Sequence, residues 1–205
     1  MNKLLIIGFL IFTYQDADKF LSKIESYNVA SYFKETVYAE HDYKSFYKLN
    51  EPQSKLNPDS YDLHLLNAAF FFATNKLRAK HNKPAFVYST SLRNAALIHS
   101  SEMVERKFFS HVNNRNRKLD KPQNRMRICG LQPTALAENI DYNFIEENET
   151  YISYAEKLVK DLYDSPPHRK NMMTNYKYLG AAVVLEKSDN KGYRYGKATQ
   201  DFATY

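Results

Sequence analysis

The chain has 205 residues, of which 29 are Lys or Arg and 23 are Asp or Glu, so its formal net charge is +6. This length fits one domain of ordinary size, or one domain with an extension, and leaves too little chain for two full domains. With 43% hydrophobic and 15% aromatic residues the chain can bury a core, which excludes a disordered protein. A single cysteine excludes an intramolecular disulfide framework and a thiolate zinc cluster.

The N-terminus begins with one cation, Lys3, and an apolar run over residues 4–14. Eleven apolar residues match the core of a secretory signal and fall short of the roughly 20 that a membrane span needs. We therefore predict a signal peptide over residues 1–17, cleaved after Ala17, and an extracytoplasmic or secreted protein. The alternatives are an uncleaved anchor or a buried first helix.

Residues 18–60 are polar and rich in tyrosine, and they end in a run of turn formers that includes Pro52 and Pro58. This composition is typical of an extension and linker, with one or two short helices ahead of the prolines. The remaining residues, 61–205, form the predicted domain.

Three helices are predicted in the domain from apolar residues at helical spacing. The first spans about 60–80 and is apolar nearly all round, so it should be deeply buried. The second spans 89–107 and the third 150–163, where Ser165-Pro166-Pro167 breaks it. About 25 residues without a clear pattern separate the second helix from Ala137, and we expect a functional or mobile loop there.

Two strands are predicted at the C-terminal end, over 178–186 and 193–205, joined by a turn at Asp189–Gly192. Helices followed by a terminal hairpin indicate an α+β fold with antiparallel strands.

The positive charge is concentrated in one stretch. Residues 105–127 hold eight cations against two acids: Arg106, Lys107, Arg115, Arg117, Lys118, Lys121, Arg125 and Arg127 against Glu105 and Asp120. Such a stretch either contacts an anionic surface or is a solvated basic loop. No aromatic residue follows Phe109 within it and no nucleic-acid motif occurs, so nucleic acid is not an expected partner.

Three segments contain side chains suited to chemistry: His111 after the second helix, Glu138 among apolar residues, and His168 after the third helix. Two imidazoles and a carboxylate brought together bind a divalent metal or perform acid–base catalysis. Each also has a simpler interpretation, as a helix-end or surface histidine or as a loop anchor. Cys129 is either a buried, inert thiol or a thiol paired between chains.

Four motifs in order and spacing resemble the CAP superfamily, the SCP-like domain of cysteine-rich secretory proteins, antigen 5 and pathogenesis-related proteins, in its bacterial-type branch. They are Asn75-Lys76-Leu77-Arg78, Ala96–Met103 with Phe109-Ser110-His111, Ala137-Glu138-Asn139-Ile140, and Ser165-Pro166-Pro167-His168-Arg169-Lys170-Asn171-Met172. Gly180 and Gln200-Asp201-Phe202 fit the family's closing hairpin. The resemblance covers roughly residues 61–205.

The resemblance implies a three-layer α-β-α sandwich with a central antiparallel sheet, a C-terminal hairpin and a central cleft. In the family a His–acid–acid–His set lines that cleft and can hold zinc or another divalent ion. His111, Glu138 and His168 match three of the four. The second acid aligns near Ser165, which is no carboxylate, so the implied metal ligands reduce to His111 and His168, with Zn2+ or another divalent cation weakly held.

These observations predict a secreted, monomeric ligand-binding module that performs no reaction, with a small molecule, lipid or peptide as ligand. The alternative is a metal-dependent hydrolase or peptidase in which Glu138 is the catalytic residue and activates a metal-bound water, while His111 and His168 hold the metal.

Overall fold

The computed structural model describes residues 17–23, 34–187 and 194–205. The helices are α2 (Val37–Glu40), α3 (Tyr43–Phe46), α4 (Asn50–Gln53), α5 (Leu63–Lys80), α6 (Thr90–Glu105), α7 (Pro122–Ile128), α8 (Tyr151–Asp164) and α9 (Pro166–Met173). The strands are β1 (Val87–Tyr88), β2 (Ala135–Phe144), β3 (Tyr178–Leu185) and β4 (Tyr195–Thr204). A further helical segment covers residues 17–23.

The strands form one sheet in the order β1-β3-β4-β2. β4 pairs antiparallel with β3 and with β2, and the two-residue β1 pairs parallel with β3. The predicted C-terminal hairpin is therefore confirmed as β3 and β4, although its predicted turn, Asp189–Gly192, lies outside the described residues.

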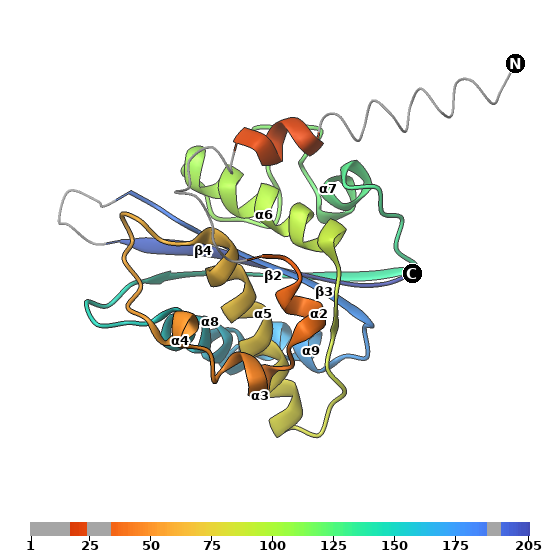
Figure 1. Ribbon diagram of the computed structural model, residues 1–205. Coiled ribbons are helices and arrows are strands. Elements are labelled where there is room, and N and C mark those ends of the chain that lie inside the picture. Colours follow the sequence, from red (N-terminus) through yellow and green to blue (C-terminus); the bar gives the residue numbers. More distant parts are fainter. Residues whose placement is uncertain (1–16, 24–33, 188–193) are drawn as a thin grey trace, which may run out of the picture.

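Helices cover both faces of the sheet (Figure 1), which confirms the α+β class and the three layers. α6 and α7 lie on one face, and α5, α8 and α9 lie on the other. α6 approaches β3 most closely at Gly180, where an added Cβ would clash with the backbone of Leu92 and Arg93. Glycine is needed there because two backbones meet.

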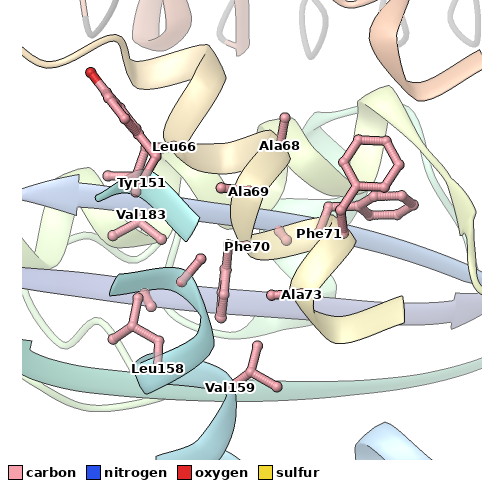
Figure 2. Packing of buried hydrophobic residues seen from close by; sticks show 14 of the residues in the cluster. Leu66, Ala68, Ala69, Phe70, Phe71, Ala73, Tyr151, Leu158, Val159 and Val183 are labelled. Carbon is pink, nitrogen blue, oxygen red and sulfur yellow. The ribbon is translucent and has the colours of Figure 1, made fainter. Parts of the chain in front are cut away.

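The larger core lies between the sheet, α5 and α8. Figure 2 shows Phe70 and Val159 among its side chains. α5 is buried nearly all round because the sheet covers one side of it, while α8 and the short helices cover the others. The Asp62 side chain caps α5 by accepting hydrogen bonds from the backbone N–H groups of His64 and Leu65 at 2.9 and 3.0 Å.

Residues 34–60 contain three short helices, which pack onto the domain. One or two were expected ahead of the prolines, whereas α4 lies within the predicted linker and includes Pro52. Val37, Phe46 and Leu56 are buried in the larger core. The ring of Tyr38 stacks on Tyr88 with a centroid distance of 3.6 Å. The apolar residues of this segment are spaced too irregularly to predict such packing from a pattern.

A second core lies on the α6 side of the sheet. It contains Leu92 and Ile98 of α6, Met126 of α7 and Ala17, with Phe20 packed against it. The rest of the predicted signal peptide, residues 1–16, lies outside the described residues. Within residues 17–23, 34–187 and 194–205, no helix is long and apolar enough to cross a membrane.

Two parts of the chain differ from the expectation. The 25-residue loop contains α7 and the first residues of β2. Ser165 ends α8, as predicted, but α9 begins at once, with Pro166 and Pro167 in its first turn. Proline is tolerated there because the first N–H groups of a helix have no intrahelical acceptor.

Candidate functional site

The site is built on β2 and β4, where two consecutive pairs of polar residues point to opposite faces of the sheet. Glu138 on β2 lies directly opposite Asp201 on β4, and Asn139 lies opposite Gln200. Successive residues of a strand point to opposite faces. Glu138 and Asp201 therefore face α6, and Asn139 and Gln200 face α5.

His111 and Glu138, two of the sequence-predicted residues, are in direct contact. His111 Nδ1 lies 2.8 Å from Oε1 of Glu138. Of the His111 side chain 48% is exposed, against 2% for Glu138. The pair therefore has a histidine at the surface and a carboxylate buried beneath it.

The second carboxylate oxygen of Glu138 binds Arg125, a residue of α7. Arg125 Nη2 lies 2.5 Å from Oε2 of Glu138 and also donates to the carbonyl of His111 at 3.3 Å. Its Nη1 donates to the carbonyl of Leu119 at 2.8 Å. The side chain of Arg125 is fully buried. Arg125 was counted in the basic stretch that could contact an anionic surface, but it is buried and is the internal counterion of Glu138.

His99 on α6 is a third group near the same carboxylate. Its Nε2 lies 3.0 Å from the carbonyl oxygen of Ser110 and 3.9 Å from Oε1 of Glu138. The ring is completely buried, and this burial lowers the pKa of His99 to about 4. His99 is therefore neutral at pH 7, and its Nε2 carries the proton, because a carbonyl only accepts.

The charge state of Glu138 follows from its partners. Burial by itself raises the pKa of a carboxyl, but the hydrogen bond from His111 and the charge of Arg125 outweigh burial and lower the pKa of Glu138. Glu138 is thus ionised and accepts hydrogen bonds only. The Nδ1 of His111 must then carry a proton, and in the neutral form of the ring this leaves the Nε2 lone pair for a ligand.

His168 is held near the pair through its backbone. Asn139 Nδ2 donates to the carbonyl of His168 at 3.1 Å, and Asn171 Nδ2 donates to Oδ1 of Asn139 at 2.9 Å. The pKa of the half-buried His168 is lowered by burial and then by the charge of His111, so the two imidazoles are within electrostatic range. Ser165 is the junction of α8 and α9, and its side chain makes no capping hydrogen bond.

The site offers a metal two imidazoles. His111 binds Glu138 through Nδ1, so Nε2 would be its ligating atom, and His168 would be the second ligand. Both oxygens of Glu138 are already bound. Across the described parts of the chain, no three His, Cys, Asp or Glu side chains are grouped to hold a metal ion. Two protein ligands are fewer than the three or four of typical zinc sites, so these residues fit a weakly held ion only.

Several motif residues have structural tasks. Asn75 binds both backbone groups of Phe86, at 2.8 and 3.1 Å. Arg78, completely buried, donates to the carbonyl oxygens of Pro84 and Met172 at 2.7 and 2.5 Å. The first motif therefore holds the end of α5 against β1 and α9, away from the histidines.

The basic stretch forms an ordered loop beside His111. Asn113, completely buried, donates through its backbone to the carbonyl of Asp120 at 2.8 Å and through its side chain to Glu102 at 2.9 Å. These bonds fix the loop between them, where Arg115 and Arg117 are exposed. Of the large hydrophobic side chains nearby, Phe109 is 49% exposed and Val112 is 38% exposed.

Comparisons with known proteins bear on the family and the fold. The family model described as the cysteine-rich secretory protein family, CAP, matches residues 71–202. No curated protein matches the sequence. Two solved structures share the fold. An extracellular protein containing a SCP domain from Bacillus anthracis is 22% identical, with a TM-score of 0.55 over 74% of this chain and 45% of that chain. An outer surface protein from Borrelia burgdorferi is 12% identical, with a TM-score of 0.52 over 74% of this chain and 98% of that chain.

Proposed function

The chain belongs to the CAP family of cysteine-rich secretory proteins, and from that premise we propose that it is an extracytoplasmic ligand-binding module. Its ligand, a small molecule, a lipid or a peptide, would bind at the exposed Nε2 of His111, with or without a divalent cation shared with His168. One observation carries the proposal: the buried Glu138 fixes His111 at 2.8 Å, which leaves Nε2 as an acceptor at the surface.

A carboxylate behind a histidine is the usual support of a metal-binding imidazole. It fixes the tautomer and ring orientation and raises the basicity of the outer nitrogen. A bound Zn2+ would supply a Lewis-acid centre for a carbonyl, carboxylate or phosphate oxygen of the ligand. His111 and His168 would hold it, and Arg125 would keep Glu138 ionised beneath them.

An extracytoplasmic location is supported by the apolar run at residues 4–14 and by the two structural neighbours, which are described as an extracellular and an outer surface protein. The chain spans 45% of the B. anthracis protein, so that protein's further activities are not transferred. Mass spectrometry of the mature N-terminus in the native host tests the location. An N-terminus at or near Asp18 supports cleavage, and an intact Met1 supports an anchor.

The hydrolase alternative needs Glu138 as a general base. The geometry disfavours this role, because Glu138 is 2% exposed, both of its oxygens are engaged and its pKa is lowered. A peptide-library screen that compares the wild type with Glu138→Gln decides the question. Cleavage by the wild type alone would establish the hydrolase.

Titration calorimetry with Zn2+ tests the metal part of the proposal. We expect weak binding by the wild type and its loss in His111→Ala and His168→Ala. Glu138→Gln should weaken binding by about 10- to 100-fold, because the second partner of a ligating histidine is removed. His41→Ala is the matched control, since His41 lies in the short-helix segment, with its Nδ1 3.2 Å from Oγ of Ser45. Equal affinity in all variants would exclude these histidines as ligands.

A second function is favoured by the ordered basic loop. We propose that Arg115 and Arg117, with the exposed Phe109 and Val112 beside them, contact an anionic membrane surface. Cations next to exposed apolar side chains are typical of interfacial binding, and each cation near such a surface contributes about 1 kcal/mol.

Vesicle sedimentation tests this contact. Binding to phosphatidylglycerol vesicles should exceed binding to phosphatidylcholine vesicles and fall with salt. It should also fall in Arg115→Glu/Arg117→Glu but persist in Lys80→Glu/Lys83→Glu, which changes the same charge at the end of α5. An equal loss of vesicle binding in both variants would mean that the net charge of the protein, and not the basic loop, determines binding.

A further inference from the structure

Asp201 is a buried acid next to the site that neither the proposed function nor the motifs explain. It lies opposite Glu138 across the β2–β4 pair and on the same face of the sheet, and it is completely buried. Directly paired residues of antiparallel strands have Cβ atoms about 5 Å apart, so the two carboxyl groups are neighbours.

The groups around Asp201 come from three further elements. β2 provides Glu138, α7 provides Arg125 and is followed by Cys129, and α6 provides His99, which lies 3.9 Å from Glu138. His99 is neutral, and burial raises the pKa of Cys129 to about 12, so this thiol is neutral as well. Arg125 is therefore the cation that acts on Asp201, and it faces two carboxyls. Arg93 of α6, which acts on Cys129, is paired with Glu35.

Arg125 and His111 both hydrogen-bond to the carboxylate of Glu138. In the part of the chain that the structure describes, neither carboxyl oxygen of Asp201 has a hydrogen-bond donor. An ionised carboxylate buried without a donor costs several kcal/mol, so the group remains neutral instead. Burial, followed by the charge of Glu138, correspondingly raises the pKa of Asp201 well above its usual value.

We propose that Asp201 is a protonated carboxylic acid that donates a hydrogen bond to the Glu138 carboxylate and so acts as a positioning residue for the Glu138–His111 pair. A proton on Asp201 accounts for two features of the cluster: two buried carboxyls that face one cation, and an Asp201 carboxyl without a hydrogen-bond donor. The proton removes the negative charge of Asp201. It also lets Asp201 donate a hydrogen bond to Glu138, in addition to those from His111 and Arg125. Glu138 then accepts from His111, Arg125 and Asp201, which fixes the plane of its carboxylate.

The location of the proton is tested by infrared spectroscopy and stability measurements at several pH values. The wild type at pH 7 should show the carbonyl band of a protonated carboxyl, and Asp201→Asn should lack it. Since the folded protein keeps a proton that the unfolded chain loses above pH about 3.9, wild-type stability should fall relative to Asp201→Asn as pH rises from there. Asp164→Asn, at an exposed position, should track the wild type. An unchanged band in Asp201→Asn, or a stability difference that does not vary with pH, would overturn the proposal.

The positioning role is tested by two substitutions and the NMR titration of His111. Asp201→Asn keeps an N–H donor, so the titration midpoint of His111 should stay close to that of the wild type. Asp201→Leu removes the donor and leaves more negative charge on the Glu138 oxygens, so the midpoint should rise. An unchanged midpoint in Asp201→Leu would refute positioning. If Asp201→Leu does not fold, the comparison of Asp201→Asn with the wild type still decides, because a large shift there contradicts the role.

Only the consequence for ligand binding rests on the proposed function. If His111 binds a ligand or Zn2+, Asp201→Asn should retain the affinity and Asp201→Leu should lose part of it. A wild type that binds no Zn2+ would count against the proposed metal site, while the infrared band and the His111 titration would still test Asp201.

Discussion

The two faces of the sheet bury polar groups in different ways, although the residues alternate along the same two strands. On the α5 face, Asn139 and Gln200 are neutral amides in a chain of hydrogen bonds that continues to Thr74. On the α6 face, their neighbours Glu138 and Asp201 are ionisable and depend on one buried cation, Arg125.

The difference teaches which of the two clusters depends on its protonation state. A fully bonded neutral network contributes rigidity at every pH. A buried cluster of carboxyls, histidines and one arginine is stable only in one protonation pattern, and removing one partner leaves an uncompensated charge. His111 reaches the surface from the α6 face, so the cluster around Glu138 lies beneath the proposed ligand site. The α5 face has an ionisable acid of its own, Asp141, whose pKa is raised to about 6 by burial.

The largest effect should come from removing the counterion on the α6 face. Arg125→Met leaves the Glu138 carboxylate buried without its cation, and we expect a loss of about 3–5 kcal/mol of unfolding free energy. Arg127→Met, at an exposed position in the same helix, should change stability by less than about 0.5 kcal/mol. Urea denaturation of the two variants measures the contrast, and equal losses would contradict the buried role of Arg125.

The next effect is the acid sensitivity of the α6 face through His99. Its folded-state pKa of about 4 lies below the ordinary value of 6.5, so only the unfolded chain gains a proton between these values. His99 should therefore contribute a loss of stability of up to about 3 kcal/mol as pH drops from 6.5 to 4, opposite in sign to the contribution of Asp201 over the same range.

The variant His99→Phe cannot take up this proton, so the stability of the wild type relative to His99→Phe should fall as pH drops through that window, as measured by denaturation at each pH. His41→Phe, at a half-buried histidine of the short-helix segment, should keep the wild-type slope. An identical slope in His99→Phe and the wild type would count against a neutral, buried His99.

A smaller effect, and one independent of pH, is expected on the α5 face. Asn139→Ala removes the bonds to the carbonyl of His168, to Gln200 and to Asn171. Leaving such buried groups without partners costs about 1–3 kcal/mol. Denaturation at pH 5 and pH 8 measures this loss of unfolding free energy. The same loss at both pH values would support the contrast between the two clusters, and a strongly pH-dependent loss would contradict it.

The smallest effect on stability should come from the basic loop. Arg117→Glu changes an exposed side chain on a loop held by Asn113, so the unfolding free energy should move by less than about 0.5 kcal/mol. Thermal unfolding measures it, and a larger loss would mean that this cation belongs to the folded framework.

Much of the fold followed from the sequence because its elements are long and strongly patterned. α5, α6, α8 and the β3–β4 hairpin were predicted close to their observed bounds. α7 and β2 were missed, since seven residues of mixed polarity and a strand with a buried acid show no clean period. Ser165-Pro166-Pro167 was interpreted only as a break, although the prolines also begin α9.

The site was predictable only in part. The motifs indicated His111, Glu138 and His168, and the structure brings His111 and Glu138 into contact. Arg125 and Asp201 were not found as site residues, because their roles depend on which residues face one another across β2, β4 and α7. The sequence did contain one signal of the Glu138–Arg125 pair. An acid among apolar residues, as in Ala137-Glu138-Asn139-Ile140, needs a buried cation as partner, and the basic stretch of residues 105–127 is a nearby source of one.

The central claim is that buried Glu138 fixes the tautomer of His111 and leaves Nε2 free at the surface. Long-range nitrogen–proton NMR of His111 at neutral pH tests it most directly, with Glu138→Gln as comparison. The account predicts that the neutral form of the ring carries its proton on Nδ1 in the wild type and is a mixture of tautomers in Glu138→Gln. A wild-type ring that carries its proton on Nε2 would contradict it.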